Sequence, residues 1–411
     1  MKTKKLLSYL LLILILGSCK TRTDSSNQSS DMPEHVIVYH QEGRFAGWPA
    51  NNGVWKFGEN EILVGFTEAE YKLGNGHNAT EPYRSWLAKS EDGGQTWTTW
   101  DPENYVGDFG DLPELKILKE PINFNNESFA MRIVGIAYHG CEDPRAHFFY
   151  SYDKGATWNG PYGFGNLANH PELKKYGLDE LTPRTDYLVT GQNECLVFMA
   201  ARKLGSFGSD RLFCIKTEDG GKTFSFQGWV VKPFLEEEEK ETFKVELTND
   251  PEKNPYATQC RAVMSQSVML KNGNIITVMR RKFVKDDLNK NWIDAYTSND
   301  QGKTWQFLSW VGDAGSGNGN PPAIAVTSDD RLCVVFGERT NGTIQAVYSS
   351  DNGKNWSDPK IIMDGFWSED MEFDDLGYPR LVSRPDGKMV AIYYYSTKEF
   401  LHHLRATIWK P

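Results

Sequence analysis

An eight-residue motif recurs five times along this chain and constrains its fold more than any other feature. The copies are SEDGGQTW, SYDKGATW, TEDGGKTF, SNDQGKTW and SSDNGKNW, which begin at Ser90, Ser151, Thr217, Ser298 and Ser349. They share the pattern S/T-x-D-x-G-x-T/N-W/F, and their aspartates are separated by 61, 66, 81 and 51 residues. One copy at each such interval predicts one copy in each four-stranded unit of a β-propeller.

The chemistry of the motif is that of a turn. Its Asp and Ser side chains can bond nearby backbone amides, and its Gly supplies a positive φ. The aromatic residue at the end can pack under the next pair of strands. A calcium loop is the alternative, but each copy carries too few carboxylates for one. We therefore expect the copies to hold hairpins closed, and the functional site to lie elsewhere in the chain.

The segments between the motifs predict an all-β fold. Short runs rich in β-branched and aromatic residues are bounded by Gly, Asn and Asp, as in NEILVGF, CLVFMAA, NIITVMRR, RLCVVFG and KMVAIYYYS. Five motifs give five blades. We predict that a sixth blade closes the ring from both chain ends, with HVIVYHQ near the start pairing with HLRATIWKP at the end. The prediction is a six-bladed β-propeller, with seven blades as the alternative.

The N-terminal region is a targeting segment. Residues 1–18 are predicted to be a lipoprotein signal peptide, because basic residues precede the apolar run LLSYLLLILIL, which is too short for a spanning helix. LGSC then resembles a bacterial lipobox, which makes Cys19 the lipidated residue. Residues 19–34 form a polar tether, and 35–411 form the propeller. This predicts a lipid-anchored protein of the bacterial cell envelope. We expect the anchor in the outer membrane, with the protein either periplasmic or surface-exposed. An ordinary secretion signal is the alternative.

The composition limits the kinds of ligand that the protein is expected to bind. A net charge of −10 argues against nucleic acid, although a local cationic pocket can still bind a small anion. Aromatic residues make up 13% of the chain, which suits both sheet packing and stacking on sugars. The six cysteines form no C-x-x-C pair and no metal motif is visible, so no metal or other cofactor is predicted. The oligomeric state stays open.

Three longer segments resemble the sialidase (neuraminidase) superfamily of Asp-box, or BNR-repeat, propellers. They are GRFAGWPANNGVWKFGENEILVGF, GNGNPPAIAVTSDDRLCVVFGERT and DLGYPRLVSRPDGKMVAIYYY, and the resemblance spans residues 36–409. It looks closest to a sialidase-like branch of bacterial lipoproteins. It implies an exo-glycosidase that releases sialic acid or a related acidic sugar from glycans. Two alternatives stay open: a polysaccharide lyase or hydrolase of different specificity, and a non-catalytic glycan-binding lipoprotein.

The resemblance also implies how the substrate is held. Sialidases bind the carboxylate of their sugar with three arginines, because guanidinium groups match its geometry and stay charged. Carried over to this chain, these arginines would be Arg44, Arg280 or Arg281, and Arg339, with Arg380 as a rival.

The implied nucleophile is Tyr378 in LGYPRLVSRPDGK. A tyrosine replaces the usual carboxylate in this family, since the substrate's own carboxylate would repel an anionic nucleophile. A glutamate should activate it from the strand near VMSQSVML, but that strand carries Ser265 and Gln266 instead. Glu338 and Glu372 are the candidates to replace it.

The general acid is expected in the loop TEAEYKLGNGHNATEP, which offers Glu68, Glu70, Glu81 and His77 but no aspartate. Either one of these groups takes the role or the chemistry differs from that of the family. Arg184 and Asp186 in TPRTDYL are also expected to reach the central cavity.

Overall fold

The computed structural model describes most of the chain downstream of the predicted tether, namely residues 32–74, 77–103, 114–135, 146–206, 209–233, 261–285, 288–369 and 375–411. The predicted signal peptide, Cys19 and nearly all of the predicted tether lie outside these residues. Residues 33–411 form one compact unit. Among the described segments, no helix has the length and apolar character needed to cross a bilayer.

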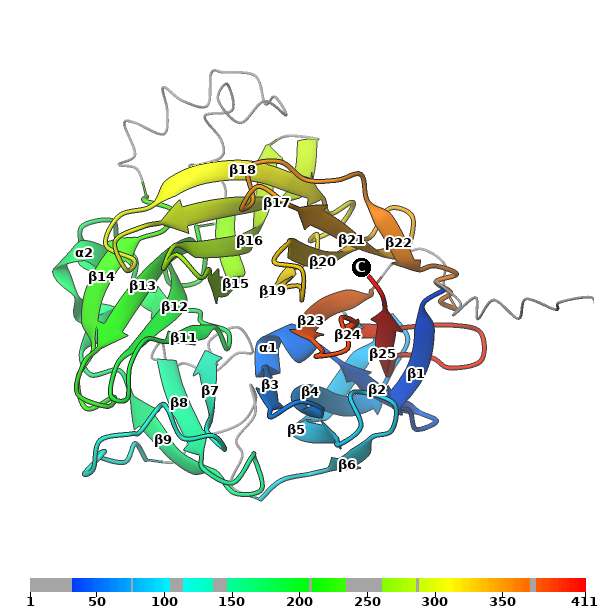
Figure 1. The fold of residues 1–411 in the computed structure, drawn as a ribbon, viewed down its shortest axis with the longest axis horizontal. Helices are drawn as coiled ribbons and strands as arrows, with labels where there is room; N and C mark the ends of the chain where they lie inside the picture. Colours follow the sequence, from blue (N-terminus) through cyan, green and yellow to red (C-terminus); the bar gives the residue numbers. More distant parts are fainter. Residues whose placement is uncertain are drawn as a thin grey trace, which may run out of the picture. The chain divides into compact units, whose positions relative to one another are not determined.

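Six antiparallel sheets surround a central axis and are numbered here as blades 1 to 6 (Figure 1). In blade 1, two short inner strands, β2 (Arg44–Gly47) and β3 (Val54–Phe57), pair with β4 (Glu61–Tyr71), which is followed by β5 (Ala79–Ser90) and β6 (Thr98–Trp100). Blade 2 comprises β7 (Ala130–Gly135), β8 (Ala146–Ser151) and β9 (Asn159–Gly163). In blade 3, β10 (Glu180–Leu181) and β11 (Tyr187–Val189) pair with β12 (Cys195–Arg202), before β13 (Arg211–Thr217) and β14 (Ser225–Trp229).

The next two blades are regular four-stranded sheets. Blade 4 comprises β15 (Arg261–Met269), β16 (Ile275–Lys285), β17 (Leu288–Ser298) and β18 (Gln306–Asp313). Blade 5 comprises β19 (Ala323–Val326), β20 (Leu332–Glu338), β21 (Thr343–Ser349) and β22 (Lys360–Met363). Helical structure between the blades is short: η2 (Leu167–Asn169) and α2 (Pro171–Lys174) precede β10.

Blade 6 is built from both ends of the described chain. Its inner strands are β23 (Gly377–Ser383), β24 (Met389–Tyr395) and β25 (His403–Trp409), and its outermost strand is β1 (Glu34–Tyr39). β1 pairs with β25 in antiparallel register, with Val36 opposite Ala406. The predicted closure by the chain ends and the prediction of six blades are both confirmed.

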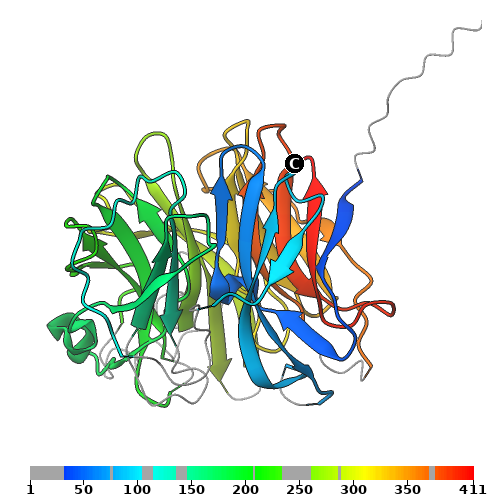
Figure 2. The same ribbon diagram turned by 90° about the horizontal axis from the view of Figure 1, so that it is seen from below.

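Apolar side chains fill the spaces between neighbouring blades. Between blades 4 and 5, for example, Val278 and Ile293 share one buried cluster with Val334 and Phe336. Alternate residues of each strand point to opposite faces of its sheet, so a blade buried on both faces needs nearly continuous apolar strands. The side view shows the strands of successive blades stacked next to one another (Figure 2).

A short helix, α1 (Pro49–Asn52), lies between β2 and β3 near the centre of the ring (Figure 1). All four of its residues are buried. Arg380 of blade 6 donates to the Ala50 carbonyl at 2.5 Å and to the Thr185 carbonyl at 2.7 Å. Arg184 Nε donates to Asn51 Oδ1 at 2.8 Å. The helix therefore joins blades 1, 3 and 6 at the axis.

The repeated motifs, called boxes below, close the turn before the outermost strand of blades 1 to 5, which is the turn between the third and fourth strands of a four-stranded blade. In the first, Ser90 Oγ and the Thr96 amide donate to Asp92 Oδ1 at 2.8 and 2.9 Å. The Gly94 amide donates to Ser90 Oγ at 2.8 Å, and Trp97 Nε1 donates to the Gly94 carbonyl at 2.9 Å. These contacts form a self-contained hairpin end, which agrees with the expected structural role.

Strand direction places the boxes on one face of the ring. Because the strands of a blade alternate in direction, turns between the third and fourth strands lie on the face opposite the turns between the second and third. We call these the box face and the opposite face. Residues at the start of each inner strand also lie on the opposite face, and it is there that the expected site residues come together.

Candidate functional site

Tyr378 is the second residue of β23 and has a left-handed backbone conformation, which is unusual for a residue other than glycine. Its φ is 49°, and the pairing of β23 with β24 shifts register between Gly377 and Arg380. The Tyr378 amide donates to Asn320 Oδ1 at 2.8 Å, and Asn320 Nδ2 donates to the Leu376 carbonyl at 2.7 Å. The Asn320 side chain thus holds the backbone on both sides of Gly377.

Gly377 is required at this bend. Its φ is 98°, and a Cβ there would lie 2.4 Å from Asn320 Oδ1. A left-handed conformation costs an L-residue such as Tyr378 about 1–2 kcal/mol, so the surrounding contacts must hold it. The result is a tyrosine with a fixed ring position and only 8% of its surface exposed.

Two buried arginines contact Tyr378 from different blades. Arg280, on β16 of blade 4, has its Nη1 donating to the Tyr378 hydroxyl at 3.3 Å. Arg339, directly after β20 of blade 5, places its guanidinium carbon 5.7 Å from the centre of the Tyr378 ring. Both arginines are buried. Cationic groups this close stabilise the negatively charged tyrosinate.

The ionisation of Tyr378 is shifted accordingly. Burial raises the pKa of its hydroxyl, but the charges of Arg280, His77 and Arg339 outweigh burial and lower that pKa to about 8. An ordinary tyrosine has a pKa of about 10, so Tyr378 would be about one-tenth ionised at pH 7. Neighbouring positive charge therefore makes the Tyr378 hydroxyl more acidic than that of an ordinary tyrosine.

A second set of contacts converges on the carboxylate of Asp375, which is fully buried. His77 Nδ1 lies 2.9 Å from Asp375 Oδ1, and Arg339 Nη2 lies 3.4 Å from the same oxygen. Tyr394 of β24 donates its hydroxyl to that oxygen as well. Burial raises the pKa of Asp375, but the His77 and Arg339 charges outweigh it and lower the pKa.

His77 lies in the loop between β4 and β5 of blade 1. Burial lowers its pKa, but the adjacent Asp375 carboxylate outweighs burial and raises it. Its ring meets the Trp48 indole edge-on, with ring centres 5.2 Å apart. About a third of the His77 side chain is exposed, so this imidazole can exchange a proton with a bound molecule.

Arg339 retains capacity to bind a ligand. Its Nη2 donates to the Leu376 carbonyl at 3.2 Å and to the Tyr394 hydroxyl at 3.3 Å. Within the described residues, its Nε and Nη1 are buried and have no hydrogen-bond partner. A buried donor without a partner costs about 1–3 kcal/mol, so an acceptor at this position would be favourable.

Arg280 and Arg281, which the sequence left as alternatives, lie on opposite faces of β16. Arg280 points toward Tyr378, whereas Arg281 on the other face donates to Asp294 Oδ2 at 2.9 Å and to the Tyr296 hydroxyl at 3.3 Å. Arg281 is fully buried in blade 4. These contacts all lie within blade 4.

Arg44 and Glu68 pair with each other in blade 1. Arg44 Nη2 donates to Glu68 Oε2 at 2.7 Å across the pairing of β2 with β4. Glu70, two residues further along β4, is exposed. The described contacts connect none of these three to Tyr378. Of the three expected arginines, the structure brings Arg280 and Arg339 to Tyr378 and pairs Arg44 with Glu68.

Arg380 and Glu338 are used in the scaffold. Arg380 holds α1 at the axis, as described above. Glu338 Oε1 accepts from the Thr340 amide at 2.8 Å, and its Oε2 accepts from the Asn341 amide at 3.0 Å, so this carboxylate caps the turn after β20. Glu81 is exposed on β5, and Glu372 lies outside the described residues.

The strand that should carry an activating glutamate carries other groups. Ser265 Oγ donates to Asp186 Oδ2 at 2.6 Å, and Gln266 Oε1 accepts from the Ile324 amide at 3.3 Å. Burial raises the pKa of Asp186. Asp186, Gln266 and Arg380 line a cavity of about 380 Å³, and Tyr378 is not among its lining residues.

Several residues of the cluster were not singled out from the sequence. They are Trp48, Lys282, Asn320, Asp375 and Tyr394. Burial, followed by the charges of Arg280 and Arg261, lowers the pKa of Lys282 to about 8. Asp375 could have been suspected from the sequence, because it lies only three residues before Tyr378 in DDLGYP. In the described part of the chain, no group of His, Cys, Asp and Glu side chains could hold a metal ion.

Fold and boxes together define a class, the six-bladed Asp-box propellers. Residues 118–392 match the BNR repeat-like domain, which is two thirds of the chain. The protein therefore belongs to the BNR repeat-like family, as the boxes predicted. No curated protein sequence matches it.

Solved structures share the fold at low identity. A Dyadobacter fermentans protein of unknown function is 17% identical, with a TM-score of 0.61, and the match covers 91% of this chain and 97% of that one. The Penicillium chrysogenum alpha-L-arabinanase bound to arabinobiose is 12% identical, with a TM-score of 0.54 and coverage of 92% and 97%. The Hadza microbial sialidase Hz136 is 14% identical, with a TM-score of 0.54 and coverage of 90% and 66%. At these identities the similarity defines the propeller fold, which glycoside hydrolases of different specificity share.

Proposed function

We propose that this protein is a glycoside hydrolase that cleaves an acidic sugar, of the sialic acid type, from the end of a glycan. The observation that carries the proposal is the buried contact of Tyr378 with Arg280 and Arg339 at the axis of a propeller. Arg339 can bind a sugar carboxylate, since it has donors without partners among the described residues, and the Arg280 guanidinium contacts the same tyrosine. Tyr378 then lies next to the anomeric carbon that bears this carboxylate.

The chemistry follows in two steps. The Tyr378 oxygen attacks the anomeric carbon, the glycosidic C–O bond breaks, and protonated His77 gives its proton to the departing oxygen. Water then attacks the same carbon, neutral His77 takes the proton of that water, and the Tyr378 oxygen leaves with its electron pair. Arg280 stabilises the tyrosinate at the beginning and the end of this cycle.

Two departures from the sialidase pattern are explained by this arrangement. The lowered pKa of Tyr378 comes from Arg280, His77 and Arg339, so no activating glutamate is needed in the strand that carries Gln266. The His77–Asp375 pair takes the place of the missing acid aspartate, because Asp375 keeps the imidazole oriented and favours its protonated form.

The same residues favour a second function, a polysaccharide lyase that acts on uronic acids. In β-elimination, arginines neutralise the uronate carboxylate, a tyrosinate removes the adjacent C–H proton, and an acid protonates the leaving oxygen. Tyr378, Arg280, Arg339 and His77 supply these groups as well. The products differ: a lyase leaves an unsaturated sugar that absorbs ultraviolet light, whereas a hydrolase leaves a saturated one.

The test uses the purified protein and its Tyr378→Phe variant. Fluorogenic glycosides of sialic acid and of glucuronic acid, together with a polyuronate, distinguish hydrolysis from elimination. We expect hydrolysis of an acidic glycoside, and a loss of turnover on the order of 10³-fold or more in Tyr378→Phe with little change in substrate affinity.

The matched control is Tyr393→Phe, which removes a buried hydroxyl from the same blade. Tyr393 points to the face of β24 opposite that of Tyr394, and its hydroxyl forms a hydrogen bond with the hydroxyl of Thr407 on β25. This variant should keep full activity. Full activity in Tyr378→Phe would refute the proposal, and binding of acidic glycans with no turnover by the unmodified protein would leave glycan binding as the function.

A further inference from the structure

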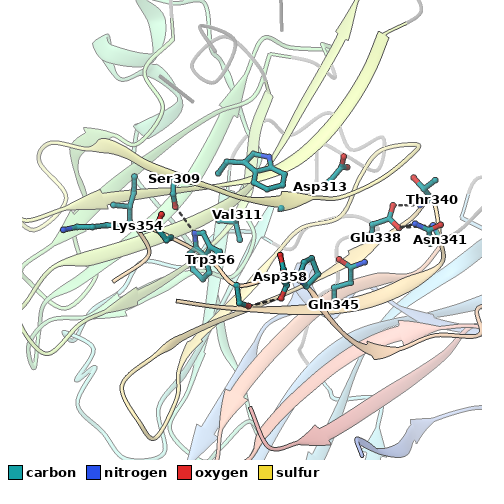
Figure 3. A pocket seen from close by; sticks show the side chains of 16 residues that line it. Ser309, Val311, Asp313, Glu338, Thr340, Asn341, Gln345, Lys354, Trp356 and Asp358 are labelled. Atoms are coloured by element: carbon teal, nitrogen blue, oxygen red, sulfur yellow. Dashed lines mark hydrogen bonds between the residues drawn. The ribbon is translucent and has the colours of Figure 1, made fainter. Parts of the chain in front are cut away.

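A groove with a volume of about 840 Å³ lies between blades 4 and 5, outside the Tyr378 cluster (Figure 3). One wall is β18 from Leu308 to Asp313, and the other contains Gln345 of β21 and residues 354–359, which end the fifth box and follow it. The turn that contains Thr340 and Asn341 also lines it. Its volume falls within the range of about 300–1,000 Å³ that is common for ligand pockets.

The walls of the groove are joined by a contact that the other boxes lack. In the box of blade 5, Trp356 Nε1 donates to Ser309 Oγ of blade 4 at 2.8 Å, whereas in blade 4 the equivalent Trp305 Nε1 donates to the Gly302 carbonyl of its own box. Ser309 Oγ in turn donates to the Gly353 carbonyl at 2.5 Å. These contacts fix the end of the fifth box against β18 of blade 4.

Trp310 gives the groove an apolar platform. Its side chain lines the groove and is 39% exposed, which is unusual for a large aromatic residue on an outer strand. The C–H face of a sugar ring can pack on an indole, because both surfaces are apolar and both leave water on contact. Polar groups must then lie close enough to form hydrogen bonds with the hydroxyls at the edge of the sugar ring.

The polar groups of the groove suit hydroxyls and disfavour anions. The side-chain amides of Asn341, Gln345 and Asn355 each donate one N–H within blade 5, and each has a second N–H and an acceptor oxygen to offer. The lining also holds three carboxylates, Asp313, Glu338 and Asp358, against one ammonium group, that of Lys354. Figure 3 shows Asp313 on the β18 side, and Gln345 and Asp358 on the blade 5 side. An excess of negative charge in a groove repels acidic ligands, in contrast to the two arginines at Tyr378.

We propose that this groove is a second glycan-binding site, which takes neutral sugar residues of an oligosaccharide. Glu338 lines the groove and its neighbour Arg339 faces Tyr378, so the two sites adjoin at the end of β20. The groove can therefore hold an uncharged part of a long glycan. This binding does not depend on the proposed function, because it needs no turnover.

The test measures binding to the full chain by isothermal titration calorimetry and tryptophan fluorescence. The probes are neutral hexasaccharides of arabinose, xylose, mannose, galactose and glucose, with oligogalacturonate and sialyllactose as acidic comparators. We expect at least one neutral hexasaccharide to bind, with a Kd raised tenfold or more by Trp310→Ala and raised less by Trp310→Phe. Gln345→Ala, a second groove variant, should raise it several-fold.

Two controls separate the groove from the rest of the molecule. Tyr152→Ala removes an aromatic side chain of similar exposure, 37%, from the box of blade 2, and should leave the Kd unchanged. Tyr378→Phe should also bind the neutral probe normally, even if the proposed hydrolase activity is absent. The proposal is overturned if no neutral hexasaccharide binds, if binding persists unchanged in both groove variants, or if the acidic comparators bind through Trp310.

Discussion

The five boxes and the Tyr378 cluster are both dense in polar hydrogen bonds, but they are assembled in opposite ways. In the first box, every partner of Asp92 lies within four residues, at Ser90, Gln95 and Thr96. In the cluster, Arg280 and Tyr378 are 98 residues apart, and His77 and Asp375 are 298 apart. Local contacts of this kind can form within one hairpin, whereas the cluster exists only after blades 1, 4, 5 and 6 have closed into a ring.

The ionisable groups of the two regions respond accordingly. Partial burial raises the pKa of Asp92, but hydrogen bonds from Thr96 and Ser90 outweigh burial and lower it. The carboxylate of Asp92 therefore stays ionised at neutral pH. In the cluster, buried groups shift one another: Tyr378 becomes more acidic and His77 more basic. Groups whose pKa values approach neutral pH suit proton transfer, while permanently ionised box aspartates suit turn stabilisation.

The largest difference between the regions should appear when the arginines are changed. Arg280→Lys and Arg339→Lys should each lower kcat/KM by about 10- to 150-fold on an acidic glycoside, equivalent to about 1.5–3 kcal/mol, because an ammonium cannot replace the guanidinium contacts. Arg44→Lys is the control, since Arg44 pairs with Glu68 in blade 1 and should change kcat/KM less than threefold.

Steady-state kinetics of the three variants tests the placement of the arginines directly. A large loss in Arg44→Lys with normal rates in Arg280→Lys would restore the arrangement expected from the sequence. It would also contradict the assignment of carboxylate binding to the buried pair.

Replacing a box aspartate should lower the stability of the protein and leave its activity unchanged. Asp92→Ala removes the acceptor of the Thr96 amide and hydroxyl. It should lower the free energy of unfolding by about 1 kcal/mol, because solvent screens the contacts of an exposed carboxylate. Its KM should not change. Glu91→Ala, which removes the neighbouring exposed carboxylate, should have a smaller effect on urea unfolding. Equal destabilisation by both would show that the box contacts contribute nothing specific.

The smallest expected effect concerns acid stability. Hydrogen bonds from Asn355 lower the pKa of Asp351 to about 2. A carboxylate with a lowered folded-state pKa contributes stability above its unfolded pKa of about 4, and this contribution is lost as the pH falls toward 2. Asp351→Asn should therefore lower the urea midpoint at neutral pH and flatten its decline between about pH 4 and 2. An unchanged acid profile would contradict the lowered pKa.

The predictability of each region from sequence follows from the same contrast. The boxes could be recognised because residue types at fixed short spacing determine their turns. Blade closure by the chain ends was also predictable, since the strand patterns of β1 and β25 lie outside the five units that the boxes mark. Arg280 could not be distinguished from Arg281, because the choice depends on which face of β16 points to the axis. Asp375 and His77 could not be paired, because their contact depends on the folded ring.

Titration of Tyr378 tests the central claim most directly. The near-ultraviolet absorbance of tyrosinate, measured as the difference between the unmodified protein and Tyr378→Phe, should rise with a midpoint near pH 8. Removing the Arg280 charge in Arg280→Gln should move that midpoint upward, since this charge is the largest influence that lowers the pKa. A difference signal that appears only at pH 10 or above would contradict the account, because Tyr378 would then be an ordinary buried tyrosine.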